Sequence, residues 1–233
     1  MPPPKFSTYI IDECSMICKG LMNNILTHRN AKDATIILIH DKAQIGPVMP
    51  KSDNWKNSSP YFTEGREYQA REWLHIHLTE QKRQTDPMFI ERLEKIRNLD
   101  KFTEKVAVFQ DRIIDAETAK RLYRFDTEDL VLASKNVLVD EWNATLQKLA
   151  PAGQLKLKYK NSTPRHAKNE RVINQSEMGA NQALAFASTI HMVQGITFTS
   201  RIFLVLKDCN FDPHLLYTAV SRVKTMDNIY LIQ

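Results

Sequence analysis

Acidic side chains follow two apolar stretches near the N-terminus. Asp12 and Glu13 come directly after residues 7–11, and Asp41 follows residues 35–39. A carboxylate at the carboxyl end of a parallel strand can hold Mg²⁺, usually through water, and a second carboxylate can orient or deprotonate a water for attack on a phosphate. Acidic pairs are common at strand ends, so this chemistry needs support from the rest of the sequence.

A second group of polar residues lies in the C-terminal half. Thr189, His191, Gln194 and Gly195 are close together in the sequence, and Arg222 lies further on. Glycine lets a backbone approach a ligand closely, and a guanidinium can bond two phosphate oxygens at once. The alternative interpretations are a hydrogen-bonded structural histidine for His191 and a helix-end arginine in a salt bridge for Arg222.

These residues belong to strings that resemble motifs II, V and VI of superfamily 1 DNA helicases of the RecD and Pif type. The strings are YIIDECSM (9–16), AFASTIHMVQGITF (185–198) and LLYTAVSR (215–222). Two further strings are similar to motifs III and IV, namely HDKAQIGPV (40–48) and LTEQKRQTDPMFIERLEKIR (78–97). In the motif III string, His40 stands where the family usually has glycine.

The resemblance implies an ATP-dependent DNA helicase that moves 5′ to 3′ on single-stranded DNA. It implies ATP as substrate, Mg²⁺ as cofactor, and roles in DNA replication, repair or recombination. The catalytic residues that it implies are Glu13, Arg83 and Arg222, with both arginines acting at the γ-phosphate. Residues expected at the nucleotide are Asp12, which would also hold Mg²⁺, and Asp41, Gln44, Gln194 and Gly195. Contacts with the single strand are expected from Thr189 and His191.

One part of such a site is missing from the sequence. No glycine is followed by lysine, so the phosphate-binding loop G-x-x-x-x-G-K-[ST] is absent. We therefore expect either the C-terminal part of a helicase or a degenerate relative that binds nucleic acid without catalysis. In both cases the chain by itself should show no appreciable ATPase activity.

A basic segment, residues 154–182, holds most of the positive charge. It contains six basic and two acidic residues, a net +4 of the chain's +5. Lys156, Lys158 and Lys160 alternate with other residues, so an extended strand would place the three charges on one face. That face is either a solvated edge that resists aggregation or a surface that contacts nucleic-acid phosphates.

Apolar stretches and helical stripes alternate along the chain. Strands are expected at 7–11, 35–39, 130–134, 202–206 and 228–232. The stretch 35–39 reads as a strand covered on both faces. Residues 46–68 are rich in Pro, Ser, Asn and Gly and are expected to form an irregular loop.

Four helices are expected between the strands. The first would have an apolar stripe of Ile17, Leu21 and Ile25. Asp86-Pro87 would open the second, which continues to Arg97, and Asp212-Pro213 would cap the last. The third would share one apolar face among Val139, Trp142, Leu146 and Leu149.

The alternation of strands and helices predicts an α/β fold. By resemblance, its parallel sheets are RecA-like. Residues 1–76 would be the C-terminal part of a first RecA-like domain, and 77–233 a second one with a short basic insertion at about 154–182.

Composition narrows the class of protein. A net charge of +5 and a pI near 9.0 suit a nucleic-acid partner. Three cysteines in 233 residues form no disulfide framework, which favours an intracellular, reducing compartment such as the nucleus or cytoplasm. Cys14 and Cys18 are expected to pack rather than bind zinc. No apolar run is long enough for a membrane helix, so no membrane partner is expected.

A third function is a metal-dependent nuclease that uses Glu80 and Lys82 with an upstream aspartate such as Asp53. We rank it last, because the helicase resemblance already accounts for this part of the sequence. His75 and His77 could form a metal pair on one strand face, but without a third ligand an exposed strand is the preferred interpretation.

Overall fold

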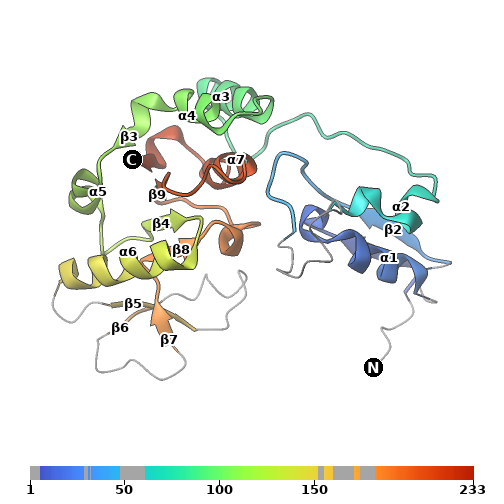
Figure 1. Ribbon diagram of the computed structural model, residues 1–233, viewed down its shortest axis with the longest axis horizontal. Coiled ribbons are helices and arrows are strands. Elements are labelled where there is room, and N and C mark those ends of the chain that lie inside the picture. Colours follow the sequence, from blue (N-terminus) through green and yellow to red (C-terminus); the bar gives the residue numbers. More distant parts are fainter. Residues whose placement is uncertain are drawn as a thin grey trace. The chain divides into compact units, whose positions relative to one another are not determined.

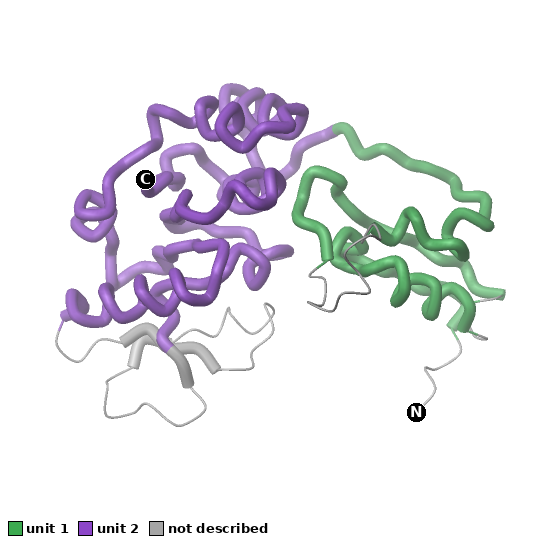
Figure 2. Tube along the Cα trace, viewed as in Figure 1, with its two compact units in different colours: residues 1–79 green, residues 80–233 purple. Residues whose placement is uncertain are grey.

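The computed structural model describes residues 6–28, 31, 33–47, 61–151, 155–159, 171–173 and 182–233, with only the backbone described at 155–159, 171–173 and 182–183. The chain forms two compact units, Met1–Thr79 and Glu80–Gln233 (Figure 2). That the first unit is the end of one RecA-like domain remains a prediction. No helix among the described residues is long and apolar enough to cross a membrane.

Unit 1 is built on a two-stranded parallel sheet. Strand β1 (Thr8–Ile11) pairs with β2 (Thr35–Leu38), with Ile11 opposite Leu38. The other elements in the described part of this unit are η1 (Cys14–Met16), α1 (Lys19–Thr27), η4 (Phe62–Glu64) and α2 (Arg66–Gln69). A hydrophobic cluster in the core of this unit contains the buried residues Cys14, Met22, Leu26 and Phe62.

Three predictions for unit 1 are wrong in detail. Helix α1 starts at Lys19, so Ile17 lies outside it, and the helix buries Met22 and Leu26 while Leu21 is 51% exposed. Strand β2 is covered on one face only, with Ile37 42% exposed. The segment predicted as an irregular loop contains η4 and α2 in its described part.

Unit 2 is built on a five-stranded sheet in which every pairing is parallel, in the order β3-β10-β9-β4-β8. The strands are β3 (Ile113–Ile114), β4 (Leu130–Ala133), β8 (Ala187–Thr189), β9 (Ile202–Val205) and β10 (Ile229–Ile232). Its helices are α3 (Pro87–Arg97), α4 (Phe102–Ala107), α5 (Ala116–Leu122), α6 (Asn136–Leu149) and α7 (His214–Val220). The single-turn helices are η5 (Gln110–Arg112), η8 (His191–Val193) and η9 (Met226–Asn228). The predicted α/β class is therefore confirmed.

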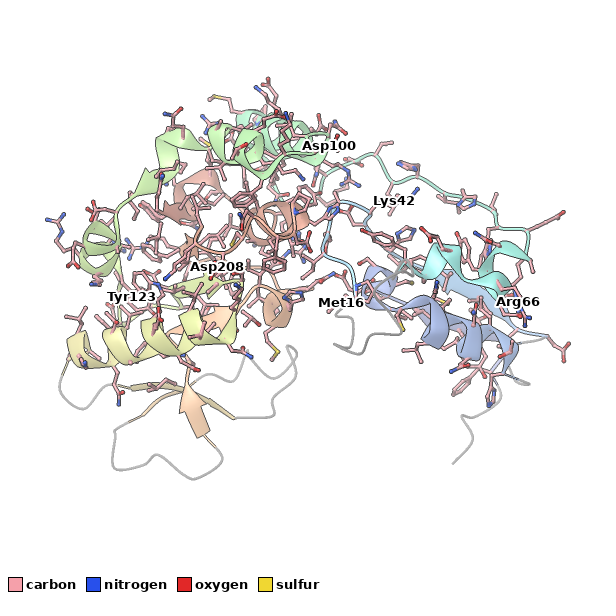
Figure 3. The ribbon with its side chains drawn as sticks, viewed as in Figure 1. Met16, Lys42, Arg66, Asp100, Tyr123 and Asp208 are labelled. Carbon is pink, nitrogen blue, oxygen red and sulfur yellow. The ribbon has the colours of Figure 1, made fainter. Side chains whose placement is uncertain are left out.

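The core of unit 2 surrounds the central strands. Every residue of β4 and β9 is buried, and α6 packs along β4 and β8 (Figure 1). Tyr123 lies in this core (Figure 3). Its ring contacts Phe186 and Phe203, and its hydroxyl donates to the Asp129 carbonyl at 2.7 Å. Unit 2 thus has a densely packed sheet to which loops can be anchored.

Local signals set the starts of α3 and α7 as predicted. The Asp86 carboxylate accepts from the Met88 amide with Pro87 at the first helical position, which starts α3. The Asp212 carboxylate accepts from the His214 amide at the start of α7. On α6 the predicted face is buried or partly buried except at its end, where Leu149 is 49% exposed because the helix finishes there.

Part of the basic segment forms a separate antiparallel sheet in the order β6-β5-β7. Its strands are β5 (Leu155–Tyr159), β6 (Arg171–Ile173) and β7 (Gln182–Leu184). The extended conformation expected at 155–159 is confirmed for the backbone. The side chains of Lys156 and Lys158, and the whole of Lys160, lie outside the described residues, so their role stays a prediction.

Candidate functional site

The predicted acidic pair lies at the carboxyl end of β1. Asp12 is exposed, and its Oδ1 accepts from the Glu13 amide at 2.8 Å. Glu13 has left-handed backbone angles (φ 53°, ψ 39°), and the next amide, of Cys14, donates to the Ile39 carbonyl at the end of β2. A glutamate at positive φ is strained, and such strain concentrates at functional sites.

The motif III residues follow the neighbouring strand. Asp41 Oδ1 accepts from the Ala43 amide at 3.0 Å, and Gln44 Nε2 donates to Asp41 Oδ2 at 3.4 Å. Gln44 Oε1 is buried and accepts no hydrogen bond from the described residues. Buried polar atoms usually have a partner, so this oxygen fits a site that gains a ligand. Because β1 and β2 are parallel, the two acidic clusters share one end of the sheet.

His40, which stands where the family usually has glycine, has a packing role. Its ring meets Phe62 edge-on, with the ring centroids 5.0 Å apart. Burial is the main cause of its lowered pKa, and nearby Lys42 lowers it further. The departure from glycine is thus accommodated by a partly buried, aromatic contact in unit 1.

In unit 2, Arg83 joins two predicted motifs. Its Nε donates to Thr197 Oγ1 at 3.0 Å, and its Nη1 donates to the Ser221 carbonyl at 2.8 Å. Thr197 belongs to the motif V string, and Ser221 immediately precedes Arg222. Residues more than 100 positions apart are therefore brought to one place.

Arg222 lies in the turn that follows α7. It is 2% exposed, and its Nη2 donates to Ser221 Oγ at 3.3 Å. Its carbonyl accepts from the Phe198 amide at 2.8 Å, where the backbone bridges Phe198 to Val223. The motif V string and the Arg222 turn are thus joined by backbone as well as by side-chain contacts.

Gln84 belongs to this cluster although the sequence did not single it out. Its side chain is buried, and Nε2 donates to the carbonyls of Ser221 at 3.0 Å and Val223 at 2.8 Å. Its one sequence signal is its position beside Arg83, which does not reveal a contact with residues about 140 positions away.

The predicted DNA-contacting residues lie at the carboxyl end of β8. Thr189 ends this strand opposite Ala133, and His191 begins the turn η8. The His191 pKa is lowered chiefly by burial, while Asp212 acts in the opposite direction. Gln194 is buried, and Gly195 has φ 79°, a conformation that suits glycine and few other residues.

Other candidate residues do not form a site in the described part of the chain. Glu80 and Lys82 pair with each other at 2.5 Å, and both side chains are exposed, while Asp53 lies outside the described residues. His75 and His77 are exposed, but no strand is assigned there. Among the described residues, no group of three or more His, Cys, Asp or Glu side chains could hold a metal ion.

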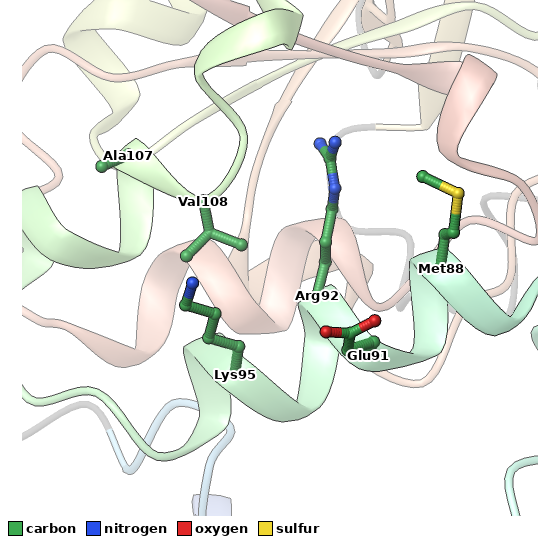
Figure 4. A pocket seen from close by; sticks show the side chains of 6 residues that line it. All are labelled: Met88, Glu91, Arg92, Lys95, Ala107 and Val108. Atoms are coloured by element: carbon green, nitrogen blue, oxygen red, sulfur yellow. The ribbon is translucent and has the colours of Figure 1, made fainter.

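A surface hollow beside α3 and α4 contains none of the predicted site residues (Figure 4). Arg92, which lines the hollow, forms an ion pair with Asp111 at 2.5 Å, and its guanidinium lies over the Phe109 ring. The hollow is lined by Met88, Glu91, Arg92, Lys95, Ala107 and Val108.

Comparison with known proteins gives the fold. No family model and no curated protein matches the sequence. A Bacteroides Pif1 helicase in complex with ADP-AlF3 and single-stranded DNA matches with a TM-score of 0.69 and 20% identity, over 97% of this chain and 70% of that one. The Pif1 helicase from Candida albicans matches with a TM-score of 0.67 and 15% identity, over 97% and 72%. The chain has the fold of a Pif1 helicase.

The Pif1 fold is consistent with RecA-like parallel sheets and with the resemblance found in the sequence. Within this fold, the Asp12 carboxylate is suited to Mg²⁺, because that ion keeps several waters and takes only one or two carboxylates from a protein. The side chain is exposed, and one of its oxygens already accepts from an amide. For a nucleotide the fit is partial, since the Pif1-like chain has the arginines and Gln44 but no phosphate-binding loop.

Proposed function

We propose that this chain provides the second motor domain of an ATP-dependent DNA helicase, together with the carboxylate part of the first. ATP hydrolysis with Mg²⁺ would drive 5′ to 3′ movement on single-stranded DNA. A phosphate-binding loop would come from residues other than these 233, because no glycine here is followed by lysine.

The convergence of distant segments in unit 2 carries the proposal. Arg83, Thr197 and the turn that holds Arg222 are linked by hydrogen bonds of 2.8 to 3.0 Å. Two arginines near one turn suit a phosphate that gains charge during transfer, because a guanidinium remains charged at any physiological pH. The Pif1 fold supports the same interpretation, since one structure of that fold is a complex with ADP-AlF3 and single-stranded DNA.

Each predicted residue has a role in the proposed reaction. Mg²⁺, held through Asp12, would neutralise phosphate charge when bound. Glu13 would orient or deprotonate the attacking water, and Arg83 and Arg222 would stabilise the transferring phosphate. Gln44 would respond to the terminal phosphate.

The remaining predicted contacts concern nucleotide and DNA. Asp41, Gln194 and Gly195 would lie near the nucleotide, while Thr189 and His191 would contact the single strand. Burial lowers the His191 pKa below its ordinary 6.5, so its contact at pH 7 would be a hydrogen bond or stacking rather than an ion pair. The free thiols of Cys14, Cys18 and Cys209 agree with a reducing, intracellular compartment as part of this proposal.

The second candidate is a non-catalytic relative that binds nucleic acid, and the missing phosphate-binding loop favours it. The two candidates differ once such a loop is supplied by fusion. The helicase proposal then expects ATPase activity, and Arg222→Ala should lower kcat on the order of 100-fold with little change in ATP binding. Arg66→Ala, whose side chain is 86% exposed in unit 1, is the matched control. If the Arg222→Ala variant of the fused protein folds, binds DNA and hydrolyses ATP at the full rate, the catalytic role of Arg222 is rejected.

Both candidates require DNA binding, which the chain itself can test. Fluorescence anisotropy with a labelled single-stranded oligonucleotide should show weak binding that falls steeply with salt. The triple change of Lys156, Lys158 and Lys160 to Glu should reduce affinity without unfolding the chain, whereas the exposed Lys101→Glu should leave it unchanged. Affinity that does not vary across the salt titration would refute the proposal.

A further inference from the structure

The turn that follows α7 has its carbonyl groups satisfied by side chains from far away in the sequence. The last carbonyls of a helix have no partner within the helix, so they need donors from elsewhere. The Ser221 and Val223 carbonyls, which flank Arg222, both accept from the Gln84 amide nitrogen, at 3.0 and 2.8 Å. One side chain therefore bridges the backbone on both sides of Arg222.

Gln84 suits this task by its chemistry and burial. A primary amide nitrogen carries two hydrogens, one for each carbonyl, and has no charge that would need a counter-ion. The side chain is 2% exposed, so water does not compete for these bonds. The neighbouring Arg83 also donates to the Ser221 carbonyl, at 2.8 Å. Gln84 and Arg83 thus share the Ser221 carbonyl as acceptor. A substitution at Gln84 would therefore affect Arg83 as well as Arg222.

We propose that Gln84 is a positioning residue that sets the location of the Arg222 guanidinium by clamping the two carbonyls around it. The inference rests on the proposed function, in which Arg222 stabilises charge on a transferring phosphate. Such a donor must be held close to its productive position before the reaction begins. The clamp, together with the Phe198 amide on the Arg222 carbonyl, fixes this turn at three successive residues.

Substitutions separate hydrogen bonding from simple space filling. Gln84→Met keeps a side chain of similar length but donates nothing, so Val223 loses its Gln84 donor. Gln84→Glu keeps the shape, but its carboxylate cannot donate, whereas its protonated form can donate one hydrogen bond. Burial beside carbonyl oxygens should raise the pKa of that introduced carboxyl group. If Gln84 only fills space, the environment of the Arg222 guanidinium should depend on pH in Gln84→Glu no more than it does in the wild type.

The test is NMR of the ¹⁵N-labelled 233-residue chain. The Nε–Hε signal of Arg222 is assigned by its loss in Arg222→Lys, and amide exchange is followed at Phe198. In Gln84→Met we expect the Arg222 signal to shift or broaden and the Phe198 amide to exchange about tenfold faster, the effect of losing roughly one hydrogen bond. Gln110→Met, the same change at an exposed position, is the matched control and should alter neither.

Gln84→Glu gives an independent readout if Gln84→Met does not fold. At about pH 8 its Arg222 signal should differ from the wild type, and it should return toward the wild-type position as the pH falls to about 5 and the carboxyl group protonates. An Arg222 signal that matches the wild type throughout, or that does not respond to pH in Gln84→Glu, would overturn the inference. These measurements use neither ATP nor DNA, so their failure would leave the proposed function standing, and absent DNA binding would not affect them.

Discussion

The sheets of the two units contain similar strands but are covered very differently. In unit 1, β2 alternates between exposed and partly buried residues, and Ile37 is 42% exposed. In unit 2, every residue of β9 is buried, and Ile202 is fully inaccessible. Both strands are short, parallel and rich in apolar residues. An apolar run therefore predicts a strand, while burial depends on which elements pack against it.

The same contrast applies to the candidate site. The acidic residues Asp12 and Glu13 follow a strand of a two-stranded sheet in which Ile10 and Ile37 are exposed. The arginines lie on turns that are hydrogen-bonded to one another and anchored on a five-stranded sheet. We infer that the cluster of Arg83 and Arg222 is preorganised within unit 2, and that unit 1 is the less stable part.

The largest expected difference concerns ion pairs. Arg201 lies 2.5 Å from Asp129, with side-chain exposures of 13% and 2%. Arg201→Met should cost about 3–5 kcal/mol of unfolding free energy, because it removes the cation beside the buried Asp129 carboxylate and leaves that charge with neutral donors such as the Arg124 amide. Arg66→Met in unit 1 breaks a pair whose arginine is 86% exposed and should cost at most about 1 kcal/mol. Urea unfolding followed by circular dichroism compares them, and equal losses would refute the contrast.

A somewhat smaller difference is expected for matched isoleucines on parallel strands. Ile202→Ala removes a fully buried side chain and should cost about 2–5 kcal/mol, while the partly exposed Ile37→Ala should cost less than about 1 kcal/mol. The same unfolding assay applies. A loss at Ile37 as large as that at Ile202 would mean that unit 1 is packed as tightly as unit 2 in solution.

The smallest effect is the dependence of stability on pH through one histidine in each unit. Burial lowers the pKa of both His40 and His191 below the ordinary 6.5. Each folded unit then binds fewer protons than its unfolded form, so this stability is fully present above pH 6.5 and is lost as the pH falls toward the lowered pKa. His40→Gln and His191→Gln should each flatten the decline of Tm from pH 7.5 to 5, whereas the exposed His77→Gln should not. If Tm falls with pH in one of these variants as steeply as in the wild type, that histidine does not contribute to the pH dependence of stability.

Local sequence signals predicted several elements of the fold, although β3, β8, α4 and α5 were not among them. The strands near residues 7–11, 130–134, 202–206 and 228–232 form as expected, and Asp86-Pro87 starts α3. Signals of this kind act over a few residues, through side-chain alternation and a capping carboxylate. They fail where cover is decided by distant elements, as at Ile37, or where a helix begins later than its apolar spacing suggests, as at Leu21.

The resemblance implied that Arg83 and Arg222 act at one phosphate, but the hydrogen bonds that join their strings were not predicted. The spacing of residues near Arg83 and Arg222 gives no indication that both contact the Ser221 turn. The role of Gln84 was not predicted, because its two hydrogen bonds join residues about 140 positions apart in the sequence. The left-handed backbone at Glu13 was equally hidden, because glutamate rarely adopts this conformation and no local signal in the sequence marks it.

ATP hydrolysis by the purified 233-residue chain, with and without single-stranded DNA, tests the central claim most directly. The claim is that the carboxylates and arginines of a helicase site are present, while the means of holding the β- and γ-phosphates is not. Phosphoryl transfer depends chiefly on positioning, so these residues should not suffice. We predict no DNA-stimulated hydrolysis above that of the matched Glu13→Gln variant. DNA-stimulated hydrolysis that disappears in Glu13→Gln would contradict the account.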